Sequence, residues 1–143
     1  MKIVINKSIG GLELSCQAMM EYAKIKGIKL YVYEWGNYDF KTDEAANDTI
    51  KEIDPLLVKQ EIFVGYTTKP VKNIRELEEN YFYENSIERN DLALIEVVEK
   101  LGEKANGPNA ELKIIEIPDD VKWEIKEGEA GGEWIAEQHR TWY

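Results

Sequence analysis

Two short runs of β-branched and aromatic residues stand on either side of an amphipathic segment, and this order constrains the fold more than any other feature. The runs are KIVIN at 2–6 and IKLYVY at 28–33. Between them, Ser15 is placed to cap a helix that Gly27 would end. Apolar residues recur there with helical spacing, namely Cys16, Met19, Met20 and Ala23. A strand, a helix of this length and a second strand predict a right-handed βαβ unit with parallel strands.

The middle of the chain predicts one further strand between helices. Polar, turn-forming residues 36–49 indicate a surface loop. The run IFVGY at 62–66 is typical of a third strand. Asn73, with Glu76 three residues later, resembles a capping box and predicts a helix to about residue 80.

The C-terminal half predicts the longest helix and a hairpin. Asp91 is placed to cap a helix over 92–105, which carries one apolar stripe. Residues 111–117 and 121–126 are typical of strands, and the short link between them predicts an antiparallel hairpin. Residues 133–140 fit a strand or a short helix, and the period of two favours the strand. The expected fold is mixed α/β (α+β), one domain over 1–143, with one mixed sheet and one continuous core.

Composition limits the partners of the chain. It has 143 residues, 43% of them hydrophobic, and a formal net charge of −10 at pH 7. A surface of this sign repels nucleic acid, so no direct contact with nucleic acid is expected. The sequence has no apolar run of membrane-spanning length, no typical secretory signal and only one cysteine, Cys16. We therefore expect a cytoplasmic protein without a membrane partner.

Both ends of the chain carry a family resemblance. The opening MKIVIN with its double glycine, the stretches VEKLGEKANG and AELKIIEIPDDVKWEI, and the segment EWIAEQHRTW resemble a family of small uncharacterised proteins encoded in bacteriophage and prophage genomes. The chain departs from the family pattern at KEGEAGG, where an acidic-Tyr-Asp-Gly turn is usual, and at Ser8 and Leu12, where a cysteine and an aromatic residue are usual. The resemblance implies infection inside a bacterial cytoplasm, where accessory proteins bind host factors or signalling molecules. It implies no catalytic residues.

The loop after the first predicted strand is the candidate ligand site. It contains Lys7, Ser8, Gly10 and Gly11. In a parallel unit this loop lies at the carboxyl end of the strand, where backbone N–H groups can hold an anion. The segment KSIGG matches neither the P-loop nor the dinucleotide fingerprint, so no cofactor is predicted. The alternative is that the glycines only shape the connection.

The end of the chain offers a second candidate. If 133–139 is a strand, His139 shares a face with Glu137 and Glu133, which would suit a general acid or base. A solvated, ion-paired face is the alternative, and one histidine with carboxylates predicts no metal site. Arg140, with Arg75 or Arg89, would bind an anion if two of these arginines met at the N-terminal loop; structural ion pairs are the alternative.

Aromatic residues near the C-terminus complete the candidates. Trp134 and Trp142 suit a partner contact, with packing in the core or in a homodimer as the alternative. The leading hypothesis is a phage accessory protein, without catalysis, that binds a host protein or a small anionic ligand. The alternatives are a small enzyme that acts on a nucleotide or phosphorylated metabolite through His139, and an acidic mimic of DNA.

Overall fold

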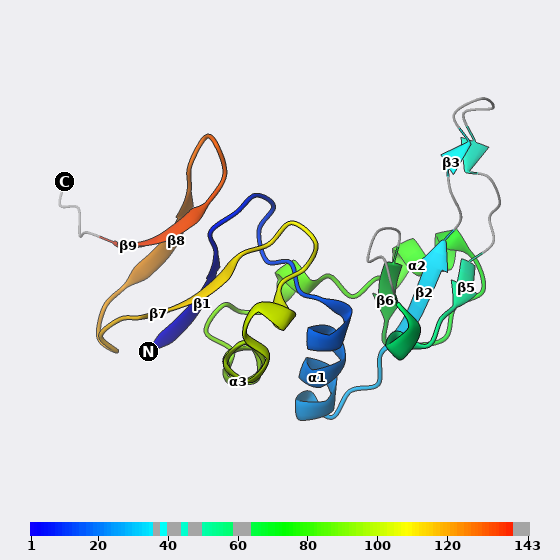
Figure 1. Ribbon diagram of the computed structural model, residues 1–143, viewed down its shortest axis with the longest axis horizontal. Coiled ribbons are helices and arrows are strands. Elements are labelled where there is room, and N and C mark those ends of the chain that lie inside the picture. The colour runs from blue at the N-terminus through cyan, green and yellow to red at the C-terminus, as the bar shows by residue number, and fades with distance from the viewer. Residues whose placement is uncertain (36–37, 40–43, 46–49, 59–63, 139–143) are drawn as a thin grey trace.

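Antiparallel strand pairs and two packed helices form the architecture (Figure 1). The computed structural model describes residues 1–35, 38–39, 44–45, 50–58 and 64–138. The strands are β1 (Lys2–Asn6), β2 (Tyr31–Trp35), β3 (Tyr38–Asp39), β4 (Glu44–Ala45), β5 (Ile50–Glu52), β6 (Val64–Thr67), β7 (Leu112–Glu116), β8 (Trp123–Glu127) and β9 (Glu133–Glu137). The helices are α1 (Cys16–Lys26), α2 (Ile74–Glu79) and α3 (Leu92–Leu101), with 3-10 turns η1 (Pro55–Leu57), η2 (Glu84–Ser86) and η3 (Gly102–Ala105). The mixed α+β class is confirmed.

Side-chain caps set the ends of the helices where the sequence predicts them. Ser15 accepts a hydrogen bond from the Ala18 N–H and begins α1, and Gly27, with φ 70°, ends it. Asp91 accepts from the Ala93 N–H at the start of α3. The predicted extension of α3 to residue 105 is a 3-10 turn, η3. No helix within the described ranges is long and apolar enough to cross a bilayer.

The predicted parallel βαβ unit is wrong. β1 pairs antiparallel with β7, with Lys2 opposite Glu116 and Asn6 opposite Leu112. β2 belongs to another sheet, of order β5-β2-β6, in which both pairings are antiparallel. Figure 1 shows the β1–β7 pair on one side of α1 and α3 and the second sheet on the other. Strand, helix and strand follow in the predicted order, but α1 connects two sheets because each strand finds its partner in a distant part of the chain.

The predicted hairpin between 111–117 and 121–126 is also wrong. β7 pairs with β1, whereas β8 pairs with β9 through a turn that contains Gly131 and Gly132. Both glycines have positive φ, 84° and 86°, which side chains disfavour. The preference for a strand over 133–140 is confirmed for 133–137. The strands occur in separate small sheets, so the single mixed sheet is wrong as well.

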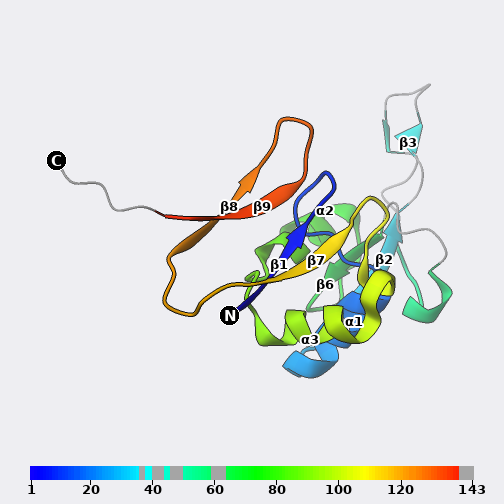
Figure 2. The same ribbon diagram turned by 60° about the vertical axis from the view of Figure 1, so that its left-hand side comes forward.

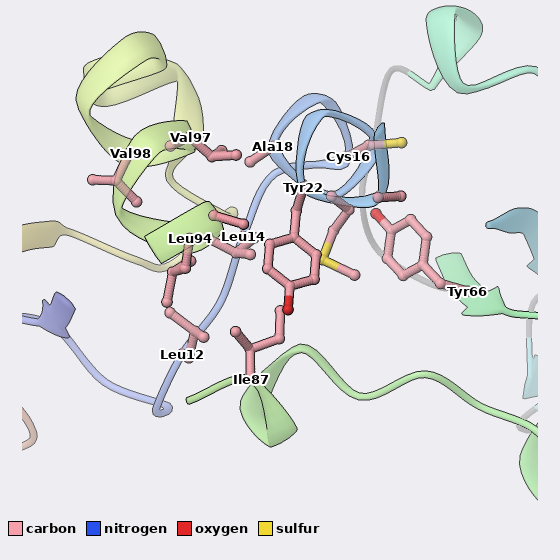
Figure 3. Packing of buried hydrophobic residues seen from close by; sticks show 14 of the residues in the cluster. Leu12, Leu14, Cys16, Ala18, Tyr22, Tyr66, Ile87, Leu94, Val97 and Val98 are labelled. Atoms are coloured by element: carbon pink, nitrogen blue, oxygen red, sulfur yellow. The ribbon is translucent and has the colours of Figure 1, made fainter. Parts of the chain in front are cut away.

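The main hydrophobic core lies between α1 and α3 and extends to the strands beside them (Figure 3). Ala18 and Tyr22 from α1 lie near Leu94 and Val97 from α3 (Figure 3). A smaller cluster includes Tyr33, Val71 and Leu77. The expected single core is therefore divided in two, because the β5-β2-β6 sheet packs α2 and nearby residues against its own side chains.

Candidate functional site

The side chain of Asn6 organises residues 7–11, the predicted anion-binding loop. Asn6 is fully buried at the end of β1. Its Oδ1 accepts hydrogen bonds from the backbone N–H groups of Ser8 and Glu111, each at 2.9 Å. The Ser8 N–H is therefore bonded within the protein rather than directed at a ligand.

The glycine end of this loop is held from two sides. Asn6 Nδ2 donates to the carbonyl oxygens of Ile9 at 3.3 Å and Gly11 at 2.7 Å. The Leu12 N–H donates to Asn85 Oδ1 at 3.1 Å. A Cβ on Gly11 would lie 3.1 Å from the same Asn85 oxygen, and the φ of Gly11 is +69°. These contacts support the alternative in which the glycine shapes the connection.

A buried ion pair joins this region to the β8–β9 hairpin. The Arg89 guanidinium forms two hydrogen bonds to the Glu133 carboxylate, at 2.6 and 2.9 Å. The side chains are 12% and 5% exposed. Glu133 Oε1 also accepts from the Asn6 N–H at 2.7 Å, and Arg89 donates to the Val4 carbonyl at 3.2 Å. The pair therefore holds β1, the segment before α3 and β9 together.

The environment of Glu133 keeps its carboxyl group charged. Burial acts to raise its pKa, but the hydrogen bonds from Arg89 and from the Asn6 N–H, together with the Arg89 charge, hold the pKa below its usual range. The planar guanidinium of Arg89 binds this carboxylate in a bidentate manner, through two N–H groups. Arg89 thus serves as a structural ion pair, one of the two roles that the sequence left open for it.

The turn of the hairpin packs directly on the loop. The Gly132 N–H donates to the Ser8 carbonyl at 3.0 Å. A Cβ on Gly131 would lie 2.4 Å from Ile9 Cγ1, and one on Gly132 would lie 3.0 Å from the Lys7 carbonyl oxygen. Only glycine fits at these positions without displacing the loop.

Gly131→Ala is expected to lower the free energy of unfolding more than Gly27→Ala does. Both glycines have positive φ, +84° and +70°, so alanine brings similar backbone strain. Gly27 has no atom within 4 Å of an added Cβ, whereas Gly131 meets Ile9. The difference should be about 1–3 kcal/mol, the usual range for overpacking, as measured by urea unfolding. An equal loss for the two variants would contradict the close packing of the turn on the loop.

The remaining predicted residues are dispersed. Lys7 is exposed, and its N–H donates to the Glu111 carbonyl at 2.8 Å. Gly10 is exposed with φ 106°. Glu137 is exposed at the end of β9, opposite Trp123.

The C-terminal candidates are placed only in part. Trp134 is 48% exposed on β9, opposite Lys126. His139, Arg140 and Trp142 lie outside the described residues, so the suggested contact of Arg140 with the loop stays a prediction. Arg75 pairs with Glu79 on α2, at 3.3 Å.

An exposed apolar region surrounds the first residue of α3. Leu92 is 83% exposed, and it lines two grooves of about 480 and 520 Å³ that share Leu92 and Glu96. The buried residue Ile95 lines the first groove, and the buried residue Ala93 lines the second. Ile25, near the end of α1, also lines the second groove and is 40% exposed. We call this region the Leu92 surface; it comprises Ile25, Glu88, Leu92, Ala93, Ile95 and Glu96 with the ion pairs at its margin. Figures 1 and 2 place α3 away from the turn of the β8–β9 hairpin.

Hydrogen bonds and an ion pair at the margin of this surface hold α1 and α3 together. Asp91 caps α3 and accepts from the Tyr22 hydroxyl at 2.9 Å and from Lys26 at 3.0 Å. Burial acts to raise the Asp91 pKa, but the hydrogen bonds from Lys26, Tyr22 and the Ala93 N–H hold it below its usual range. Burial and the Asp91 carboxylate together raise the pKa of Tyr22. One carboxylate therefore ties the start of α3 to the end of α1.

A third groove lies at the start of α1 and has a volume of about 710 Å³. Its lining includes Cys16, which is 2% exposed as expected for a buried small hydrophobic residue. Ser15 Oγ donates to the Lys104 carbonyl at 2.6 Å, which fixes one wall. Leu56, at 91% exposure, forms part of the rim.

Comparison with known proteins found no family model, no curated protein and no solved structure that matches this chain. Among the residues that the structure describes, no group of three or more histidine, cysteine, aspartate or glutamate side chains is arranged to hold a metal ion.

Sequence reasoning missed both the Arg89–Glu133 pair and the Leu92 surface. The two charged residues are 44 positions apart, and nothing local connects them. The exposure of Leu92 could have been predicted from the sequence, because this residue lies outside the helical stripe formed by Leu94, Ile95 and Val98. An apolar residue outside the stripe is expected to be exposed, as Leu92 is in the structure.

Proposed function

We propose that this chain is a binding protein, without catalysis, that recognises another protein during phage infection of a bacterium. The phage setting comes from the family resemblance of its two ends. The observation that carries the binding role is the Leu92 surface, an apolar side chain 83% exposed beside two grooves. Apolar anchors that enter grooves supply much of the free energy of protein association.

The helix does not need leucine at this position for its own stability. Asp91 caps α3, and the apolar stripe on its other side packs into the core. Single exposed hydrophobic residues are common, but Leu92 stands beside two grooves whose lining includes the apolar residues Ile95, Ala93 and Ile25. Protein recognition is the function that best uses an exposed leucine in this setting.

The small anionic ligand has less support at the predicted loop. The N–H groups of Ser8 and Leu12 donate to Asn6 and Asn85. The nearby Arg89 charge is neutralised by Glu133. A phosphate at this loop would have to displace these partners, so we favour the protein partner over the anion.

The proposal is tested by affinity capture with the tagged full chain from infected bacteria, followed by reconstitution with each purified candidate. We expect one identified protein to form a saturable complex with the purified chain. A parallel screen with nucleotides measures shifts in thermal unfolding. If no purified candidate binds again, or if only a nucleotide binds, the proposal is overturned.

A further inference from the structure

We infer that the Leu92 surface binds a cationic amphipathic helix of the partner protein. This inference rests on the proposed protein-binding function and adds the chemistry of the partner segment. It follows from three properties of the surface: its apolar grooves, its uncompensated acids and the elements that form it.

The apolar grooves set the first requirement on the partner. Leu92 is 83% exposed and lines both grooves, one together with the buried side chain of Ile95 and the other together with the buried side chain of Ala93. Ile25, 40% exposed, extends the apolar region onto α1. A partner gains the most by inserting apolar side chains beside Leu92, because both groups then leave water.

The charges set the second requirement. The basic groups at the margin already have partners, with Lys2 bound to Glu99 at 2.6 Å and Lys26 to Asp91 at 3.0 Å. Glu88 and Glu96 are exposed and form no ion pair with any described residue. These two carboxylates border the same apolar region, so the partner that complements it carries lysine or arginine beside its apolar face.

The elements that form the surface favour a helix over a strand. The surface consists of side chains from α1, α3 and the segment that precedes α3, and one of its grooves is also lined by Met1, Lys2 and Asp119. The nearby strand β1 pairs with β7, and its Val4 N–H donates to the Arg89 carbonyl at 2.8 Å. A peptide would find side-chain grooves rather than an edge for main-chain pairing, and this is the helix-in-groove mode of recognition.

A second copy of the chain fits this surface less well. A symmetric contact brings the same patch of both copies together, so one interface would enclose the carboxylates of Glu88 and Glu96 from both copies. Like charges at an interface disfavour association. The cationic helix removes this repulsion, so the charges favour it over a second copy.

Three designed peptides of about 18 residues, long enough for five helical turns, provide the test. The first is an amphipathic leucine–lysine helix, the second has glutamate in place of lysine, and the third has the composition of the first in a non-amphipathic order. Binding to the full chain is measured by fluorescence anisotropy at low and at physiological ionic strength. We expect the first peptide to bind most tightly and its affinity to fall with salt.

Matched variants locate the site. Leu92→Ala should weaken binding of the leucine–lysine helix about tenfold, whereas Leu56→Ala, at a leucine that is 91% exposed elsewhere, should leave it unchanged. The double variant Glu88→Gln/Glu96→Gln should weaken it about three- to tenfold and flatten its salt dependence. The control Glu78→Gln/Glu129→Gln removes the same charge at exposed positions away from the surface and should have less effect.

The results separate this inference from the proposed function. Equal binding of all three peptides, or equal effects of Leu92→Ala and Leu56→Ala, would overturn the cationic helix at this surface. If the natural partner still binds in reconstitution and Leu92→Ala leaves that complex intact, the protein-binding function stands and only the site is wrong. If no purified partner binds, the function itself fails.

Discussion

Arg89→Met is expected to lower the free energy of unfolding by about 3–5 kcal/mol, the typical cost of removing one partner from a buried ion pair. The substitution keeps most of the apolar stem but leaves the Glu133 carboxylate, 5% exposed, without its guanidinium. The Asn6 N–H remains as a hydrogen-bond donor to that carboxylate, but it supplies no full charge. Urea unfolding followed by circular dichroism measures the loss.

Arg75→Met is the matched control for this substitution. Arg75 also pairs with a glutamate, but its side chain is 88% exposed and that of Glu79 is 61% exposed. Its removal should cost no more than about 0.5 kcal/mol. The double variant Arg89→Met/Glu133→Leu should recover much of the loss, because no charge then remains buried. If Arg89→Met costs no more than Arg75→Met, the buried pair does not hold the hairpin in place.

Acid should remove the same contribution from the native protein. The pKa of Glu133 is lower in the folded chain than in the unfolded chain, so its stabilising effect is complete above the unfolded pKa. The effect is lost as the pH falls through the folded pKa. In Arg89→Met the buried carboxyl takes up its proton at a higher pH, because burial then acts without the compensating charge. The difference between the two proteins should therefore shrink on acidification.

Local signals in the sequence predicted the helices well. Ser15, Gly27 and Asp91 stand at the helix boundaries that their side-chain chemistry predicts. A cap bonds to a backbone group two or three residues away, so its meaning is contained in a short window of sequence. The apolar stripe of α3 is equally local, and its residues lie in the core.

The pairing of the strands could not be predicted from such short stretches of sequence. β1 and β7 are joined by main-chain hydrogen bonds between distant segments, and an alternating or apolar run specifies no particular partner. The short link after β7 suggested a hairpin, but the turn with two positive-φ glycines lies between β8 and β9. Those glycines were visible in the sequence. Their preference for a tight turn was the stronger signal.

The sequence singled out Arg89 as a possible anion-binding residue but did not show which group it binds. Arg89 lies near the end of loop 7–11, because it donates to the carbonyl of Val4 and to the side chain of Asn85, which also accepts from the Leu12 N–H. The carboxylate that receives this arginine belongs to the protein itself, Glu133. The sequence does not show which acid will pair with Arg89, because the two residues are far apart in the chain. Once an acid of the protein itself neutralises the guanidinium, its charge no longer attracts an anionic ligand.

Asn6→Ala is expected to lower the free energy of unfolding by about 3–5 kcal/mol, since it leaves four partly buried main-chain groups without their partner. The Asn6 side chain accepts from Ser8 and Glu111 and donates to Ile9 and Gly11. Alanine fills none of these roles and also leaves a small cavity. Amide hydrogen exchange should show the largest loss of protection at Ser8 and Glu111, with urea unfolding as the measure of stability.

Two further variants test the role assigned to Asn6. Asn73→Ala removes an asparagine that accepts one main-chain hydrogen bond at the start of α2, and it should cost only about 1 kcal/mol. Asn6→Asp keeps the shape but turns a carboxylate oxygen toward the carbonyls of Ile9 and Gly11. Burial and these carbonyls should raise the pKa of the new carboxyl in the folded chain above the unfolded value of about 3.9. The free energy of unfolding of Asn6→Asp should therefore fall further below that of the native chain as the pH rises from below this value. If the loss of stability in Asn6→Asp is independent of pH, the hydrogen bonds donated by the Asn6 side chain do not hold the loop in place.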